Sequence, residues 1–151
     1  MAWLSRLLCR AGSPAPDFDL ADLSGRRQSL GTLLEGRSAL LLDFFYLACA
    51  PCVAAFPMIE RLGEAHGAHG LGVVAISRGD TLDALRRFAD AHARHALLLA
   101  APDDDPVFLA YRVFTYPTTC LIDSTRRIAH RQSGGDAAAW QAALARQGLG
   151  R

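Results

Sequence analysis

Two cysteines separated by two residues are the strongest chemical feature of this 151-residue sequence. They form the motif Cys49-Ala50-Pro51-Cys52, which follows the apolar run 38–46 and precedes apolar residues at helical spacing. Such a pair can bind a metal, form a structural disulfide, or open and close as a redox centre. The residues around the motif bear on the choice between these three chemistries.

The motif lies where a buried strand is expected to end and a helix to begin. The apolar run 38–46 has the length of a central strand, and the following pattern predicts a helix to about residue 65. Free N–H groups and the helix dipole stabilise a thiolate at a helix N-terminus. We therefore predict that Cys49 is the exposed attacking nucleophile. Cys52, one helical turn later, can resolve the mixed disulfide.

Asp43 is a carboxylate in the middle of the apolar run LLLDFFY. Burying a carboxylate is costly unless it has a partner or a function, and burial raises its pKa. We predict that Asp43 accepts the proton that Cys52 must lose to become a thiolate. An alternative is an Asp at a strand irregularity that accepts a hydrogen bond from the backbone.

A second segment, TYPTTCLID, places Pro117 directly before a predicted strand. A cis X-Pro bond there would make a sharp turn into the strand possible. If this proline faces the cysteines, it leaves the preceding backbone free to pair with an extended peptide and keeps metal from the thiolates. We predict that Tyr116, Pro117 and Thr118 bind the partner, together with Ala50 and Pro51 between the cysteines.

Strands and helices alternate along the rest of the chain. The patterns predict a β-hairpin over 17–30, strands at 38–46, 71–77 and 96–100, a second hairpin at 118–123 and 126–132, and helices at 82–94, within 102–113 and at 136–148. Asp80 or Thr81 is expected to cap the helix at 82–94. The predicted fold is α/β, with a central mixed sheet flanked by helices and an N-terminal β-hairpin extension. One domain, 14–151, is expected after a short arm, 1–13.

The overall composition excludes several classes of partner. Sixteen basic and fifteen acidic residues leave a net charge of +1, which gives no reason to expect nucleic acid or an anionic membrane. No run of eighteen apolar residues occurs, so no membrane span is predicted. Four cysteines are too few for a disulfide-rich scaffold.

These pieces together resemble the thioredoxin superfamily, in particular its TlpA/ResA-like, AhpC/TSA-type redoxin branch. The matching segments are APDFDL, LLLDFFYLACAPC and AYRVFTYPTTCLID, within about residues 14–147. The resemblance implies a thioredoxin-like fold, a cis-Pro117 and thiol–disulfide exchange without a cofactor or metal. It also implies disulfide- or dithiol-containing protein partners and an upstream reductant, either thioredoxin or a membrane dithiol carrier.

The sequence departs from this family at four positions. Ala48 replaces the usual tryptophan before the first cysteine, which removes one wall of the substrate groove. Ala55 stands where many TlpA-like proteins have a buried glutamate, and Tyr116 is bulkier than the common residue before the proline. Cys120 replaces a typical phenylalanine and is read as a small buried hydrophobic residue.

Other functions on the same fold stay open. Peroxiredoxins have a threonine three residues before the peroxidatic cysteine, whereas Tyr46 and Cys49 occupy those positions here. A zinc or copper site would need further ligands, and no second CxxC or paired Cys/His motif is present. A non-catalytic adaptor usually lacks one cysteine. We therefore favour a monomeric thiol–disulfide oxidoreductase. The proline before Cys52 indicates reduction, by analogy with reducing thioredoxins.

The sequence gives two opposing indications of the compartment. The N-terminal residues MAWLSRLLCR lack the order of a secretory signal, which favours the cytoplasm. The family resemblance instead favours the cell envelope.

Overall fold

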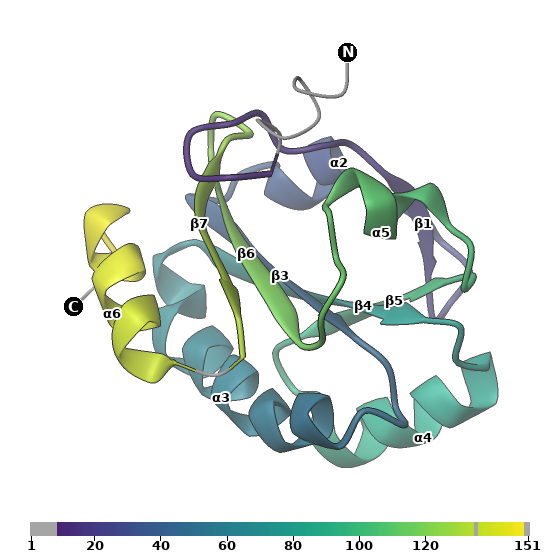
Figure 1. The fold of residues 1–151 in the computed structure, drawn as a ribbon. Coiled ribbons are helices and arrows are strands. Elements are labelled where there is room, and N and C mark those ends of the chain that lie inside the picture. The colour runs from purple at the N-terminus through teal and green to yellow at the C-terminus, as the bar shows by residue number, and fades with distance from the viewer. Residues whose placement is uncertain (1–8, 135, 150–151) are drawn as a thin grey trace.

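A seven-stranded mixed sheet, in the order β2-β1-β5-β4-β3-β6-β7, lies at the centre of the computed structural model, which describes residues 9–134 and 136–149 (Figure 1). The strands are β1 (Asp19–Asp22), β2 (Arg27–Ser29), β3 (Ala39–Phe45), β4 (Leu71–Arg78), β5 (Leu97–Ala101), β6 (Thr118–Asp123) and β7 (Ile128–Ser133). β4 runs parallel to both β3 and β5, and the other neighbouring strands are antiparallel. The mixed sheet predicted from the sequence is confirmed.

Helices cover both faces of this sheet (Figure 1). One layer contains α2 (Leu30–Leu34) and α5 (Pro106–Ala110), and the other contains α3 (Ala50–His66), α4 (Leu82–His92) and α6 (Ala137–Arg146). A short 3-10 helix, η1 (Gly67–His69), follows α3. No helix among the described residues is long and apolar enough to cross a membrane.

Every residue of the central strand β3 is buried, which is why its sequence is an almost continuous apolar run. Its side chains alternate between the two layers. Leu40, Leu42 and Phe44 pack with the cluster that includes α2 and α5. Leu41 and Phe45 pack on the opposite face, toward α3. β3 therefore joins the two halves of the core and carries the chain to the cysteine motif.

The N-terminal hairpin of β1 and β2 extends the main sheet, because β1 also pairs antiparallel with β5. Helix α2 was not predicted, because the predicted hairpin ends at residue 30 and no element was expected between it and the strand at 38–46. Ser29 caps this helix by accepting a hydrogen bond from the Thr32 N–H at 3.2 Å. Of the predicted arm, residues 1–8 lie outside the described residues. The rest contacts the fold: Cys9 is buried, and the N–H of Gly12 donates to the carbonyl of Ile128 at 2.7 Å.

Candidate active site

Cys49 and Cys52 form a disulfide where β3 ends and α3 begins, with their Cα atoms 5.2 Å apart. Cys49 is the N-cap residue of α3, and its Sγ accepts a hydrogen bond from the Cys52 N–H at 3.3 Å. The N–H of Cys49 donates to the carbonyl of Tyr46 at 3.1 Å, which closes the turn after β3. The first sulfur therefore lies at the N-terminus of a 17-residue helix, where backbone N–H groups favour a thiolate.

The disulfide is more buried than the sequence predicts. Cys49 is only 5% exposed and Cys52 is 1% exposed, so the exposed first sulfur that we expected is not found. Both cysteines belong to an apolar cluster with Phe45 and Phe56, and Tyr46 packs against the same cluster. Partner access is therefore controlled by the side chains that cover the sulfurs as much as by the motif itself.

A carboxylate from the segment that follows β4 holds the loop before the motif. Asp80 Oδ2 accepts a hydrogen bond from the Leu47 N–H at 2.9 Å, and it also accepts one from the Ser77 hydroxyl. Thr81, not Asp80, caps α4. The sequence indicated Asp80 only as a possible helix cap, because its actual partner lies 33 positions earlier in the chain.

Tyr116, the residue directly before Pro117, packs beside the cysteine motif. The Tyr116–Pro117 peptide bond is cis, as the sequence predicts. The Tyr116 ring packs edge-on against the Tyr46 ring, with centroids 5.1 Å apart, and Tyr116 packs against the cluster that contains both cysteines. Tyr46 and Tyr116 thus supply aromatic surface beside the motif, where Ala48 supplies none.

The five predicted binding residues differ in how much they face solvent. Ala50 and Pro51 are exposed and Tyr116 is half-buried, whereas Pro117 and Thr118 are buried. The Thr118 hydroxyl donates to the carbonyl of Thr115 at 2.7 Å, and its backbone belongs to β6 between β3 and β7. Thr118 therefore lies behind Pro117 and not on the surface.

Asp43 lies on the same face of β3 as Phe45, because the two residues are two positions apart on the strand. Phe45 belongs to the cluster that contains both cysteines. Its neighbours across the sheet are Ala75 on β4 and Thr119 on β6. The residue is 2% exposed, and burial raises the pKa of its carboxyl to about 7. Asp43 can therefore gain and lose a proton near neutral pH beneath α3.

The other two cysteines are unsuited to thiolate chemistry. Cys120 is fully buried, as expected for a small hydrophobic residue, and burial raises the pKa of its thiol to about 11. Burial also raises the pKa of the Cys9 thiol, whose Sγ donates to the carbonyl of Ala110. Both remain protonated at neutral pH, so neither competes with the Cys49–Cys52 pair as a nucleophile.

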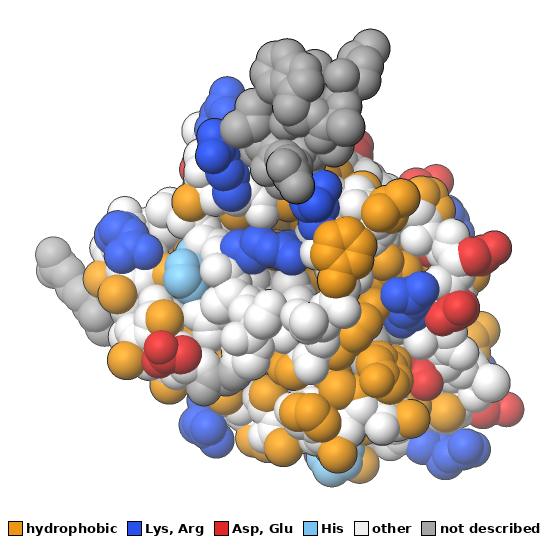
Figure 2. Space-filling model, in the orientation of Figure 1, with side chains coloured by type: hydrophobic (Ala, Val, Ile, Leu, Met, Phe, Trp, Pro, Cys, Tyr) orange, Lys and Arg blue, Asp and Glu red, His pale blue; other side chains and the backbone are white. Residues whose placement is uncertain are grey.

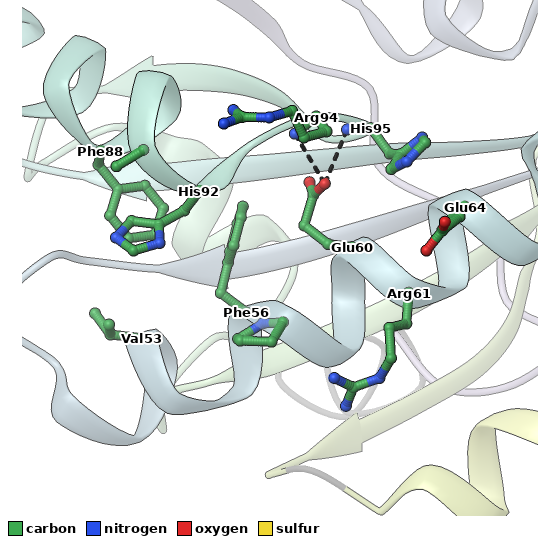
Figure 3. Close-up of a pocket in the computed structure, with 11 residues that line it drawn as sticks. Val53, Phe56, Glu60, Arg61, Glu64, Phe88, His92, Arg94 and His95 are labelled. Atoms are coloured by element: carbon green, nitrogen blue, oxygen red, sulfur yellow. Dashed lines mark hydrogen bonds between the residues drawn. The ribbon is translucent and has the colours of Figure 1, made fainter.

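A groove of about 490 Å³ runs along α3 and α4 and reaches Val53, the residue after Cys52 (Figure 3). Phe56 and Phe88 contribute its apolar surface. Glu60 projects into it and accepts hydrogen bonds of 2.8–2.9 Å from the backbone N–H groups of three consecutive residues, Arg94, His95 and Ala96. Glu60 therefore ties α3 to the start of β5. The sequence did not indicate this contact, because its partners lie at least 34 positions away.

Glu60→Ala is expected to lower the free energy of unfolding by about 2–3 kcal/mol, because it leaves three backbone donors without their charged acceptor. Glu60→Gln keeps one carbonyl acceptor and should lose less. Urea unfolding followed by circular dichroism measures both. Glu64→Ala is the matched control, since Glu64 lines the same groove from the same helix and is exposed. Equal losses for Glu60→Ala and Glu64→Ala would contradict this structural role.

The side chains of residues 9–134 and 136–149 do not indicate a metal site. Within those ranges, no group of three or more His, Cys, Asp or Glu side chains is placed to hold a metal ion.

Comparison with known proteins agrees with this geometry. The family model for the AhpC/TSA family matches residues 11–131. The thiol-disulfide oxidoreductase ResA of Geobacillus thermodenitrificans is 34% identical over 78% of this chain and 66% of its own length. ResA of Halalkalibacterium halodurans is 32% identical over 86% of this chain and 72% of its own length. The chain therefore spans about two thirds of the length of these relatives.

A solved structure supports the same fold. The thiol-disulfide oxidoreductase from Bacteroides fragilis superposes with a TM-score of 0.77 and 21% identity, covering 89% of this chain and 98% of that one. The thioredoxin-like fold predicted from the sequence is thus confirmed. The sequence matches show that the chain belongs to the AhpC/TSA family, in the ResA-like branch of the thioredoxin superfamily.

Proposed function

We propose that this chain is a thiol–disulfide oxidoreductase that reduces disulfides in partner proteins. The observation that carries the proposal is the Cys49–Cys52 disulfide with Cys49 as the N-cap of α3. Because the same two sulfurs are within bonding distance of each other and beside helical N–H groups, they can alternate between dithiol and disulfide. The ResA relatives, named thiol-disulfide oxidoreductases, support the same class of reaction.

The reaction begins from the reduced dithiol. The Cys49 thiolate attacks one sulfur of the partner's disulfide, a new S–S bond forms, and the partner's other sulfur leaves as a thiolate. The Cys52 thiol then transfers its proton toward the Asp43 carboxylate and attacks Cys49 Sγ. This step closes the Cys49–Cys52 disulfide and releases the partner's second thiolate. Two electrons pass to the partner, and an external dithiol must return them.

Partner binding is assigned to the surface around these sulfurs. Ala50 and Pro51 are exposed next to Cys49, and the half-buried Tyr116 precedes the cis-Pro117 on the neighbouring loop. An extended partner segment can lie between these two stretches, with Thr118 supporting Pro117 from behind. Thioredoxin or a membrane dithiol carrier is the kind of donor that would regenerate the dithiol.

A single-turnover experiment tests this proposal against a peroxidase. The reduced protein is mixed with an excess of a peptide that contains one disulfide or, separately, with hydrogen peroxide. We expect one peptide disulfide to be reduced per chain, with formation of the Cys49–Cys52 disulfide. The peptide reaction should be at least about 100-fold faster than the peroxide reaction, because the site lacks a threonine hydroxyl three residues before Cys49. Faster consumption of peroxide would contradict the proposal.

A further inference from the structure

Two of the three large hydrophobic side chains that are exposed among the described residues lie together, on and just after α5. Leu109 on α5 is 71% exposed, and Phe114, between α5 and β6, is 65% exposed. Both line a hollow of about 440 Å³, together with Arg78 and Phe108. We call Leu109, Phe114 and this hollow the α5 patch. Figure 2 shows hydrophobic side chains forming a band on this face that extends from the region of α5 toward α3 and α4.

The α5 patch is held in place before any partner binds. The Val113 N–H donates to the carbonyl of Phe108 at 2.8 Å. Arg131 donates to the carbonyls of Tyr111 and Arg112 at 2.7 Å each. The segment that carries Phe114 is therefore fixed at its base, and its exposed ring does not result from a loose loop. A preformed apolar surface lowers the entropic cost of binding.

One side of the α5 patch is acidic. Among the described residues, Asp103, Asp104 and Asp105 line the hollow with Arg78, and the Arg112 guanidinium lies over the Phe114 ring at 5.5 Å, so three acidic side chains face two basic ones. Asp103 pairs with Arg78 Nε at 3.1 Å, and Asp105 accepts the Val107 N–H at the start of α5. Asp104 is exposed and makes neither contact. A basic side chain of a partner would meet a net negative charge here.

Arg78 connects the α5 patch to the redox site. Its guanidinium lies over the Phe108 ring at 4.9 Å, and its Nη1 donates to the Tyr116 hydroxyl at 3.0 Å. The Tyr116 ring contacts Tyr46, whose carbonyl accepts the Cys49 N–H. The α5 patch is therefore continuous with the surface beside the disulfide.

We propose that the α5 patch is a docking surface for the disulfide-containing partner. It binds a segment of that partner in which an apolar side chain lies next to Lys or Arg. The apolar side chain packs on Leu109 and Phe114, the basic side chain faces Asp104, and the partner's disulfide is thereby directed toward Cys49. This inference rests on the proposed function and adds to it the chemical character of the substrate.

The test measures kcat/KM for three disulfides under one reductant. Two synthetic peptides share a disulfide loop and a phenylalanine and differ only in two flanking residues, Lys-Lys or Glu-Glu; the third substrate, hydroxyethyl disulfide, is too small to reach the α5 patch. The variants are the double substitution Leu109→Ser/Phe114→Ser and the charge reversal Asp104→Lys. Leu82→Ser on α4 is the matched control, because Leu82 is also an exposed large hydrophobic side chain, at 43%.

We expect the unmodified protein to prefer the Lys-Lys peptide by about fivefold at low salt, with the preference shrinking as salt screens the charges. The double substitution should lower kcat/KM for the Lys-Lys peptide about tenfold and leave hydroxyethyl disulfide unchanged. Asp104→Lys should reverse the preference between the peptides. Leu82→Ser should change none of these values.

Three outcomes would overturn the docking surface or the proposed function. If the unmodified protein reduces hydroxyethyl disulfide and neither surface variant alters the peptide values relative to Leu82→Ser, the docking surface is wrong and the proposed function stands. If the unmodified protein reduces none of the three disulfides, the proposed function fails and the docking surface falls with it. An equal loss on peptides and hydroxyethyl disulfide would assign the defect to the redox site, and would also overturn the docking role.

Discussion

Cys49→Ser is expected to abolish catalysed disulfide reduction, lowering kcat/KM for a peptide disulfide by at least about 1000-fold, because a serine hydroxyl cannot replace the attacking thiolate. Cys52→Ser should behave differently. It keeps the first attack but lacks the sulfur that closes the disulfide, so it should stop as a mixed disulfide between Cys49 and the partner.

Mass spectrometry of the intact variants after exposure to the peptide distinguishes the two cases. Cys52→Ser should gain the mass of one peptide chain per protein, and dithiothreitol should remove it. Cys120→Ser is the control, because Cys120 is fully buried outside the motif and should leave turnover unchanged. Trapping by Cys49→Ser instead of Cys52→Ser would show that the assigned roles of the two cysteines are reversed.

Asp43→Asn is expected to slow the resolving step about 100-fold at pH 8 and to leave it nearly unchanged at pH 5.5. The pKa of the Asp43 carboxyl is raised to about 7, so the carboxyl is mostly protonated at pH 5.5 and can accept a proton only above about pH 7. The rate of the unmodified protein should therefore rise through this range. The rate of the resolving step is measured by stopped flow, as release of the peptide from a preformed mixed disulfide at Cys49. An unchanged pH profile in Asp43→Asn would contradict the proton-transfer role.

Asp43→Asn is expected to slow the resolving step but to stabilise the folded protein at high pH. A carboxyl whose pKa is raised from 3.8 to about 7 by folding favours the folded state in its protonated form, so its burial becomes increasingly unfavourable as the pH rises from about 4 to 7. Asp43→Asn removes this charge and should raise the free energy of unfolding at pH 8 by up to about 4 kcal/mol. At pH 4 it should give no such gain.

Asp22→Asn is the matched control for this pH dependence. Hydrogen bonds, chiefly from the Ser24 hydroxyl, lower the pKa of the Asp22 carboxyl to about 2. That carboxylate stabilises the fold above about pH 4 and loses its contribution as the pH falls toward 2. Asp22→Asn should therefore destabilise the protein equally at pH 5.5 and pH 8. A gain for Asp43→Asn that is the same at pH 4 and pH 8 would rule out a buried, titrating carboxyl.

Most elements of the fold can be predicted from local patterns in the sequence. Strand β3 is recognisable because both of its faces are buried, and the hairpin of β6 and β7 because a short polar turn separates two segments of strand length. The cysteine motif and Pro117 are equally visible, since each requires particular residue types at a fixed spacing. Helix α2 was missed because it has five residues, too few to show a helical period.

Contacts between distant segments could not be predicted in the same way. Asp80 holds the Leu47 N–H, and Glu60 holds the backbone before β5, yet both are ordinary polar residues in sequence. The burial of Cys49 likewise depends on aromatic residues from separate segments, including Phe56 and Tyr116. These features depend on which elements become neighbours in three dimensions, and a single sequence gives no measure of that.

A redox titration of the Cys49–Cys52 pair tests the central claim most directly. The protein is equilibrated in defined dithiothreitol and glutathione buffers, its thiols are alkylated, and the oxidised fraction is read by mass spectrometry. We predict one two-electron transition with a midpoint near −270 mV, on the reducing side of the thioredoxin scale, approximately as for thioredoxin itself. A midpoint near −120 mV would contradict the reducing direction. Failure of the two sulfurs to pair at any potential would contradict the dithiol mechanism altogether.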